Sequence, residues 1–371
     1  MSAVDNVTTS LDTPEGGGRN RFSDVLSNTD IAELLAKQAE GETGILSRAF
    51  RRAARSAFLW PENATDLATQ NRSLTELRGI GPFIEKQIRR WLDKPPPLSR
   101  KIPATRQDFI SLAEAKQLLA RKPAWAKNLR GDLQMHTLWS DGSGVIAEMA
   151  DAAKERSYEY IAITDHSKGL KIAGGINESA LKKQGSEVAK INSSLIKAGA
   201  KLRVLHSIEM NLNPRGEGDM SPKSLLPLDL VLGSFHSSLR RIEDQTQRYL
   251  AALRNPNIQI LAHPRGRIYN YRIGLSADWP RVFAKAAELD KALEIDCYPD
   301  RQDLNVGLLK VAREHGTRIS MGTDAHHPWQ LQFIELGLAA ALKAKISSHQ
   351  IINFMSTSDL TNWVKQTRQH S

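Results

Sequence analysis

The sequence has little cysteine and no long apolar run, and each absence excludes a class of protein. Its 371 residues contain one cysteine, Cys297, which excludes an internal disulfide framework and fits a reducing compartment. No stretch reaches the ~18 uninterrupted apolar residues of a membrane span. Residues 1–20 are polar and glycine-rich and lack the apolar core of a signal peptide, which predicts a disordered arm. We therefore expect a cytoplasmic protein without a membrane partner.

Short apolar runs that each stop at a histidine or an acid occur seven times along the chain, and most are followed by helical periodicity. The residues at or just beyond the ends of these runs are His136 with Asp141, Asp165 with His166, Glu209, His236, His263, Asp296, and Asp324 with His326. Apolar strands that alternate with helices predict a parallel sheet covered by helices. Seven units predict a (β/α) barrel one unit short of the usual eight, with all strand ends at one mouth. The functional site is expected at that mouth, and Cys297 is expected to pack beside the sixth strand.

A net charge of +10 favours an anionic partner, and two basic runs lie at residues 48–58 and 85–94. Between them, residues 74–92 (LTELRGIGPFIEKQIRRWL) have apolar residues at helical spacing on both sides of a GIG hairpin. Glycine lacks a Cβ, so the backbone N–H groups of the next helix can approach a phosphate. This pattern predicts a helix-hairpin-helix that binds DNA without sequence preference, and the alternative is an ordinary helical turn. The expected DNA contacts are Gly79, Gly81, Lys86, Arg89 and Arg90.

Residues 22–94 resemble the small N-terminal helical domain of family X DNA polymerases, in which a lysine on the second helix can act as a deoxyribose-phosphate lyase. Gln87 stands at the position of that lysine. Lys86 beside it should point elsewhere, because one residue is about 100° of helix rotation. The resemblance therefore implies DNA binding without lyase chemistry.

The segment that follows is too short for a polymerase core. Fewer than 40 residues separate the hairpin from the barrel, namely a proline-rich spacer (DKPPPLSRKIPATR) and one predicted helix (SLAEAKQLLARK). No strand carries the paired aspartates that nucleotidyl transfer needs. The expected domains are a disordered arm at 1–20, a helix-hairpin-helix domain at 21–94, a linker with a helix at 95–126, and the barrel domain at 127–371.

Residues 127–365 resemble a PHP (polymerase and histidinol phosphatase) domain of the kind found in bacterial family X polymerases. The matching stretches run in the family's order: DLQMHTLWSDG, ITDHSKGLKIAGGI, IEMNL, GSFHS, AHPRGR, LEIDCYPDRQDL and GTDAHH. The resemblance implies an α/β fold, a distorted (β/α)7 PHP barrel preceded by a small all-α helix-hairpin-helix domain.

The same resemblance implies a cluster of about three divalent ions, zinc, manganese or iron, which imidazoles and carboxylates suit. The first site would use His136, Glu209 and Asp324; the second Glu209, His236 and His263; the third Asp141, His166 and His326. The family's fourth ligand of the first site is the leading histidine of an HxH pair, and this chain has Gln134 there. We expect Gln134 to weaken that site.

The expected chemistry is hydrolysis of a phosphate ester. Two ions ~3.5–4 Å apart lower the pKa of a shared water and clamp the oxygens of an in-line phosphoryl displacement. The expected catalytic residues are His136, Glu209, His236, Asp324 and Arg267. Arg267, Arg301 and Lys168 are expected to contact the substrate phosphate, and the alternative for each is a salt bridge with a loop acid.

Several histidines and acids are assigned other roles. Asp165 is expected to orient His166, and Asp296 is expected to do likewise for a neighbouring ligand. His327 follows His326 and is a weaker candidate for a ligand. The remaining histidines are expected in the core or on the surface, at His206, His315, His349 and His370.

These features predict a metal-dependent phosphoesterase that hydrolyses DNA phosphodiester bonds with metal-activated water, as a 3′–5′ exonuclease or 3′-end processing enzyme in DNA repair. One alternative is a phosphomonoesterase like histidinol phosphatase, whose small substrate would leave the helical domain without a role. Another is a DNA-binding protein whose metal site is impaired at Gln134. The pattern indicates no oligomeric state.

Overall fold

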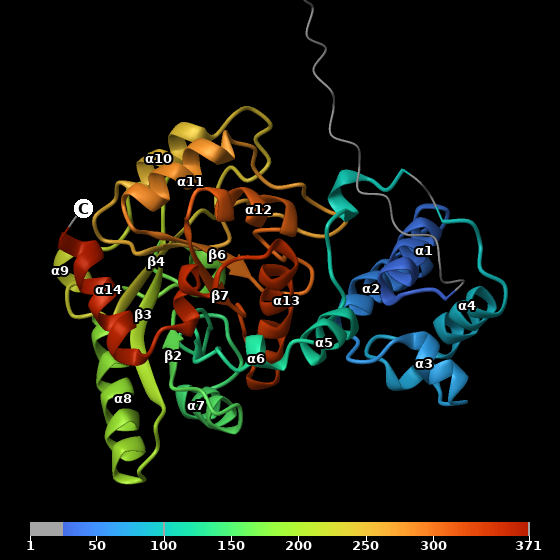
Figure 1. Ribbon diagram of the computed structural model, residues 1–371, viewed down its shortest axis with the longest axis horizontal. Coiled ribbons are helices and arrows are strands. Elements are labelled where there is room, and N and C mark those ends of the chain that lie inside the picture. The colour runs from blue at the N-terminus through green and yellow to red at the C-terminus, as the bar shows by residue number, and fades with distance from the viewer. Residues whose placement is uncertain (1–24, 99–100, 370–371) are drawn as a thin grey trace, which may run out of the picture.

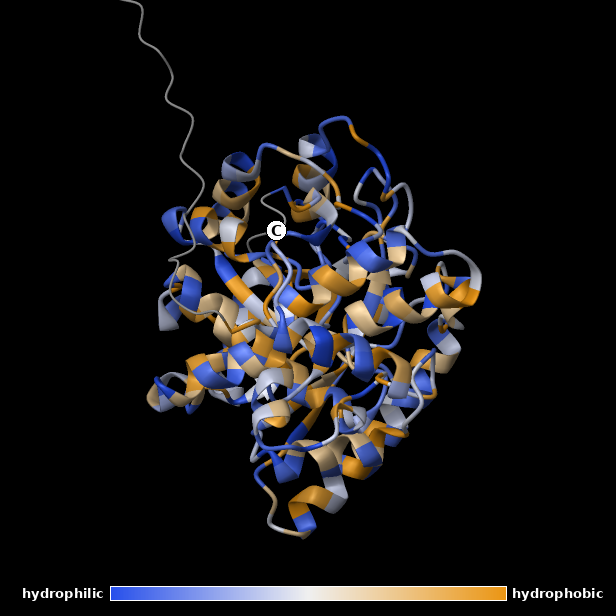
Figure 2. Cartoon of the chain, turned by 90° about the vertical axis from the view of Figure 1, so that its right-hand side faces the viewer, coloured by the Kyte–Doolittle hydropathy of each residue, from blue (hydrophilic) through white to orange (hydrophobic). Residues whose placement is uncertain are grey.

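The computed structural model describes residues 25–98 and 101–369, which form a barrel and a helical region beside it (Figure 1). The expected N-terminal arm, the first residues of the expected helical domain and His370 lie outside the described residues. In Figure 2 most helices carry hydrophobic and hydrophilic residues side by side, as expected of helices that cover a core with one face.

Seven parallel strands form the barrel in the order in which they occur along the chain. They are β1 (Gly131–Asp132), β2 (Tyr160–Ile163), β3 (Arg203–Asn211), β4 (Leu230–Ser234), β5 (Ile260–Leu261), β6 (Ala292–Asp296) and β7 (Arg318–Gly322). The chain just beyond β1 returns to β7, because the Leu133 N–H donates to the Met321 carbonyl at 3.3 Å and the His136 N–H donates to the Ala325 carbonyl at 2.7 Å. The barrel is therefore nearly closed, and the predicted fold class is confirmed.

Helices cover the outside of the barrel and close one of its ends. The outer helices are α7 (Ile146–Glu155), α8 (Glu178–Lys197), α9 (Pro222–Leu225), α10 (Thr246–Leu253), α11 (Trp279–Glu288), α12 (Val306–Glu314) and α13 (Ile334–Ala344). Every residue of β2, β4 and β6 is buried, as expected of strands covered on both faces. The last helix, α14 (Thr357–Gln369), packs Leu360 and Trp363 against Tyr160 and Leu230, the first residues of β2 and β4. The opposite end, where the strands finish, is left as the mouth.

The helical region consists of α1 (Asn28–Glu40), α2 (Gly44–Ser56), α3 (Ala64–Thr69) and α4 (Pro82–Asp93). Helix α1 begins at a capping box in which the side chains of Ser27 and Asp30 each accept the other's backbone N–H. The first helix of the predicted helix-hairpin-helix is reduced to one 3-10 turn, Leu74–Glu76, because Leu77 is already extended. A hairpin followed by a full helix is present.

The linker packs between the two parts of the molecule. Phe109 of the linker contacts Phe58 of the helical region and Tyr269 of the barrel, with ring centroids 5.5 and 5.2 Å apart. Beyond it, α5 (Leu112–Ala120) is the helix predicted before the barrel, and α6 (Pro123–Ala126) follows. Because Tyr269 lies in the loop after β5, this contact fixes the helical region beside the barrel mouth. The predicted division at residues 94 and 126 stays a prediction.

Two predictions from the absences in the sequence can be compared with the structure. Among the described residues, no helix combines the length and apolar character needed to cross a membrane. Cys297 is buried directly after β6, as predicted. The cytoplasmic location stays a prediction.

Candidate metal centre

Glu209, within β3, is the centre of a cluster of histidines at the barrel mouth. Its side chain is fully buried, and its two carboxylate oxygens lie close to four imidazole rings that come from four different segments. The oxygen-to-nitrogen distances are 2.7 Å to His263, 3.0 Å to His166, 3.2 Å to His236 and 3.4 Å to His136. Parallel strands end at one edge, so residues far apart in the sequence meet there.

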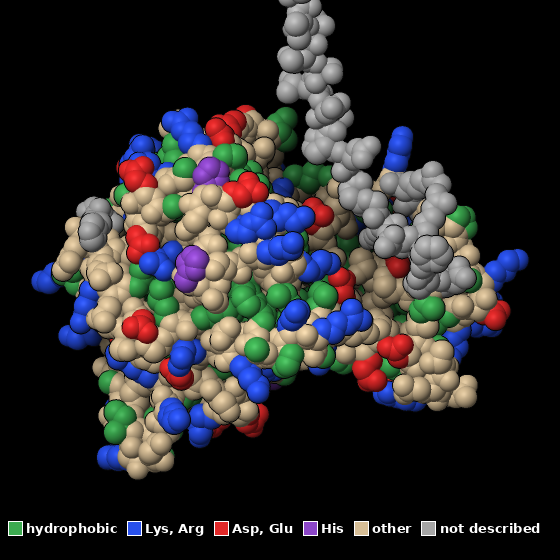
Figure 3. Space-filling model, viewed as in Figure 1, with side chains coloured by type: hydrophobic (Ala, Val, Ile, Leu, Met, Phe, Trp, Pro, Cys, Tyr) green, Lys and Arg blue, Asp and Glu red, His purple; other side chains and the backbone are tan. Residues whose placement is uncertain are grey.

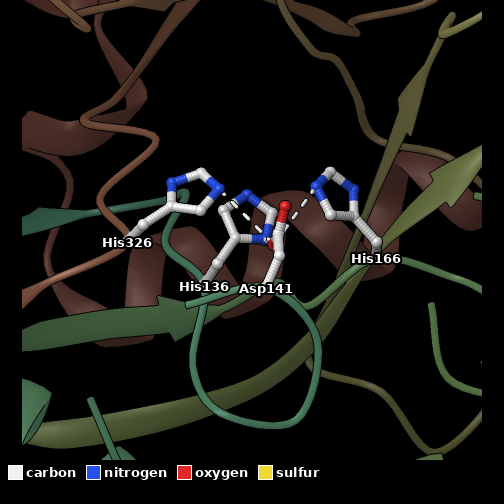
Figure 4. Close-up of side chains that lie close together, drawn as sticks. All are labelled: His136, Asp141, His166 and His326. Atoms are coloured by element: carbon white, nitrogen blue, oxygen red, sulfur yellow. Dashed lines mark ion pairs between the residues drawn. The ribbon is translucent and has the colours of Figure 1, made fainter. Parts of the chain in front are cut away.

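Asp141 and Asp324 complete the cluster on either side of His136. An oxygen of Asp141 lies 3.4 Å from His326, 3.7 Å from His166 and 4.0 Å from His136, and Figure 4 shows Asp141 between His136 and His166. An oxygen of Asp324 lies 2.9 Å from Nε2 of His136. All eight predicted histidine and acid ligands are thus brought together. Three groups of donors are close enough to hold an ion each: His136 with Asp141, His166 and His326; His166 with Glu209 and His236; and His136 with Glu209 and Asp324.

Two of these residues have an unusual backbone conformation. His263 has φ 26° and Asp324 has φ 51°, in the left-handed region that non-glycine residues rarely adopt. Such conformations persist only where the surrounding structure enforces them, and they concentrate at functional sites. Here they turn the chain sharply just beyond β5 and β7.

Groups of opposite charge lie close together in the cluster. Burial alone would lower the pKa of His263, but the Glu209 carboxylate raises it to about 10. Burial also opposes protonation of His326, and its hydrogen bond to Asp141 raises its pKa to about 9. Arg301 places Nη1 2.7 Å from Asp324. The carboxylates therefore make this part of the barrel mouth favourable for positive charge.

The donor set fits divalent metal ions. It combines imidazole nitrogens and carboxylate oxygens, the ligands that zinc, manganese and iron share. His136 supplies a further sign, since its Nδ1 is buried without a hydrogen-bond partner in the described structure. A buried polar atom left unpaired is unfavourable unless a ligand satisfies it.

Gln134 contacts a residue that the sequence did not single out. With the amide oriented to match its surroundings, its nitrogen donates to both oxygens of Glu294, at 2.7 and 2.5 Å. Glu294 also accepts the backbone N–H of His263 at 2.8 Å. Gly322 leaves room for the pair, because a Cβ there would lie 2.4 Å from Glu294. The only hint in the sequence was an acid inside the apolar run ALEID.

We expect Gln134→Ala to leave the metal content unchanged and to lower the free energy of unfolding by about 1–3 kcal/mol, because buried Glu294 loses its amide partner. Metal analysis and urea unfolding of the purified variant measure the two effects. Loss of one ion with unchanged stability would instead make Gln134 a ligand.

The three cations predicted to contact phosphate lie in different surroundings. Arg301 lies at the edge of the cluster, within 2.7 Å of Asp324. Arg267 lines the same cavity, but its guanidinium stacks on Phe109 at 3.9 Å and donates to the Gln107 carbonyl at 2.8 Å, since a buried guanidinium needs acceptors. Lys168 forms an ion pair with Glu178 at 2.7 Å. A substrate contact for Arg301, Arg267 and Lys168 stays a prediction.

The predicted role of Asp165 is wrong. Its carboxylate accepts hydrogen bonds from Thr137, Ser140 and Gln184, so it holds the loop that carries Asp141 instead of orienting His166. Asp296 accepts the Tyr298 N–H and lies 3.7 Å from Arg301. His263 lies beside Glu209 but outside the three donor groups, where His166 stands with Glu209 and His236 in its place. The other described histidines also lie outside these groups, at His206, His315, His327 and His349.

Comparison with known proteins gives relatives of two kinds. The model of the PHP domain family matches residues 132–316. "DNA polymerase/3'-5' exonuclease PolX" of Bacillus subtilis is 35% identical over 263 residues, covering 71% of this chain and 44% of that protein. A "probable phosphatase" of Caldicellulosiruptor saccharolyticus is 26% identical over 207 residues, covering 53% of this chain and 80% of that protein.

Among solved structures, histidinol phosphate phosphatase from Lactococcus lactis, in complex with zinc, L-histidinol and phosphate, aligns with a TM-score of 0.41 and 17% identity. The alignment covers 58% of this chain and 93% of that one. The chain spans less than half the length of the Bacillus subtilis relative, at 44%.

Proposed function

The chain belongs to the PHP family, and from that premise we propose that it is a metal-dependent phosphoesterase that hydrolyses DNA phosphodiester bonds. The observation that carries the proposal is Glu209, a buried carboxylate whose two oxygens lie within 3.4 Å of four histidines. A buried charge surrounded by metal-binding groups at a barrel mouth is typical of a catalytic site.

The residues of the cluster suit phosphoester hydrolysis. When bound, divalent ions lower the pKa of water and neutralise charge on the phosphoryl oxygens. Glu209 and the histidines would hold those ions. Arg301 would pair with a phosphate oxygen from the edge of the cluster, because its guanidinium already lies there against Asp324. The mouth above the cluster is a cavity of about 290 Å³, lined by the predicted ligands His166, His236 and His263 and by Arg301.

DNA is the proposed substrate because a basic helical region stands beside the mouth. Lys86 and Arg90 line an open hollow of about 440 Å³ on α4, while Arg89 is already paired with Glu85 at 2.8 Å. Lys and Arg side chains are spread over both parts of the chain on the face drawn in Figure 3. The name of the Bacillus subtilis relative supports 3′–5′ polarity. A role in DNA repair and a cytoplasmic location belong to the same proposal.

The two hairpin glycines should differ in their roles. Gly79 has φ +80°, and a Cβ there would lie 2.5 Å from the Ser56 hydroxyl, whereas a Cβ on Gly81 would meet nothing within 4 Å. We expect Gly79→Ala to lower the free energy of unfolding by at least about 1–2 kcal/mol. Gly81→Ala should change it by less than about 0.5 kcal/mol. Urea unfolding of both variants measures these changes. If Gly81→Ala weakens DNA binding without a loss of stability, a phosphate approaches the backbone closely at that residue.

The proposed function is tested with 5′-labelled single-stranded DNA and added manganese, for the wild type, His236→Ala and the surface control His349→Ala. Stepwise shortening by the wild type and the control, with intact DNA in His236→Ala, is the expected result.

The second candidate is a phosphomonoesterase, which the 80% coverage of the Caldicellulosiruptor phosphatase favours. Hydrolysis of p-nitrophenyl phosphate without DNA shortening would support it. If the protein slows the migration of DNA in a gel without cutting it, and the purified protein contains no metal, it would be a binding protein with an impaired metal site.

A further inference from the structure

A cleft joins the helical region to the metal centre. It has a volume of about 810 Å³ and lies between α1 and α2 on one side and the loops after β5 and β6 on the other. Ile268, Arg301 and His326 line both this cleft and the smaller cavity over the metal centre. The two hollows therefore adjoin each other, and the predicted metal ligand His326 lines both.

Helix α2 supplies a basic stripe along the cleft. Arg48, Arg51, Arg52 and Arg55 are exposed and follow the spacing i, i+3, i+4, i+7, which places them on one side of the helix. The residues of the opposite side, including Phe50 and Ala54, are buried, and α2 contains no acidic residue. Arg51 and Arg55 line the cleft.

Most of this positive charge is not neutralised within the chain. In the part of the chain that the structure describes, Arg48, Arg51 and Arg52 make no ion pair, and Arg55 approaches only Asp300, at 3.9 Å. The other acid that lines the cleft, Glu40, is bound by Arg106 at 2.5 Å. Arginines held on one helix face without acidic partners suit a run of phosphates.

An exposed aromatic ring stands on the other wall. Ile268 and Arg272 are joined by two backbone hydrogen bonds of 2.9 Å, so the chain between them forms a tight hairpin. Tyr269 points from this hairpin into the aromatic contact with Phe58, whereas Tyr271 is 61% exposed. One face of Tyr271 is covered by the Arg240 guanidinium, 4.9 Å from the ring centroid. The hairpin thus holds an exposed ring in a fixed position.

We propose that this cleft binds single-stranded DNA, with its backbone along the α2 arginines and a base against Tyr271, and that it directs the strand end to the metal centre. The inference rests on the proposed function and adds to it a binding site separate from the hairpin and α4. A positively charged groove combined with a stacking ring is the usual means of binding a single strand without sequence preference. Duplex DNA keeps its bases stacked on one another and offers none to the ring.

The test is binding of a fluorescently labelled single-stranded oligonucleotide, followed by anisotropy in the presence of a chelator so that no hydrolysis occurs. We expect Arg51→Ala and Tyr271→Ala each to weaken binding by about tenfold and Tyr271→Phe to bind as the wild type does. Arg51→Ala should also reduce the slope of log affinity against log salt by about one. Arg281→Ala, an exposed arginine on α11, is the matched control.

A small diester, bis(p-nitrophenyl) phosphate, separates this inference from the proposed function. The cleft variants should hydrolyse it at the wild-type rate. If the wild type hydrolyses neither the ester nor DNA, but Arg51→Ala and Tyr271→Ala weaken DNA binding as expected, the proposed function is wrong and DNA binding by the cleft is supported. Unchanged DNA binding by Arg51→Ala and Tyr271→Ala would overturn the proposal that the cleft binds DNA. A loss of small-ester hydrolysis as large as the loss of DNA binding would also overturn it, because it would show that these residues have a structural role only.

Discussion

Glu209→Gln is expected to lower the rate of DNA hydrolysis by at least about 10³-fold, equivalent to about 4 kcal/mol of activation free energy. The amide has nearly the shape of the carboxylate but lacks its charge and one acceptor oxygen. Four histidines converge on Glu209, so the change removes the carboxylate that belongs to two of the three donor groups. The initial rate of shortening of 5′-labelled DNA with added manganese measures the loss.

The matched control is Glu288→Gln, which makes the same change on an exposed residue of α11 paired with Lys285. It should hydrolyse DNA at the wild-type rate. Glu209→Gln should still bind single-stranded DNA under chelator, because the cleft does not include it. A Glu209→Gln enzyme with more than about a tenth of the wild-type rate would contradict a metal centre built on this carboxylate.

Arg106→Met is expected to lower the free energy of unfolding by about 3–5 kcal/mol, because it leaves a charge buried without its partner. The Arg106 side chain is only 4% exposed and holds both oxygens of Glu33, itself 10% exposed, at 2.9 and 3.0 Å. It also donates to Asn270 at 3.2 Å, in the loop that presents Tyr271. Urea unfolding followed by circular dichroism measures the loss.

The double variant Glu33→Met/Arg106→Met separates lost pairing from lost packing. Replacing both members of a buried ion pair with apolar residues is often neutral, so the double variant should recover most of the lost free energy of unfolding. Arg254→Met, an exposed arginine at the end of α10, is the control and should change stability by less than about 0.5 kcal/mol. A double variant no more stable than Arg106→Met would show that the ion pair is not the cause.

The barrel and its donors could be predicted because the sequence repeats a simple pattern. Each apolar run that ends in a histidine or an acid became a strand, and parallel strands must deliver their ends to one mouth. Glu209 and His263 are 54 residues apart in the sequence, yet their side chains approach to 2.7 Å, because the topology brings both residues to the same mouth.

The sequence pattern could not predict which groups the individual side chains contact. Arg267 follows β5, as predicted for a residue that contacts phosphate. Its guanidinium, however, stacks on Phe109 and donates to the Gln107 carbonyl. Gln134 follows β1 at a predicted ligand position, and its amide donates to Glu294, a buried acid of β6 that is far away in the sequence. The cleft could not be predicted from the sequence either, because the position of α2 beside the mouth depends on the contact between Phe109 and Tyr269.

The most direct measurement is the metal content of the purified chain, determined by inductively coupled plasma mass spectrometry after dialysis against zinc or manganese, for the wild type and Glu209→Gln. We predict about three ions per wild-type chain and fewer than about one in Glu209→Gln, since this carboxylate belongs to two of the three donor groups. A wild-type chain that holds no more metal than Glu209→Gln would contradict the account.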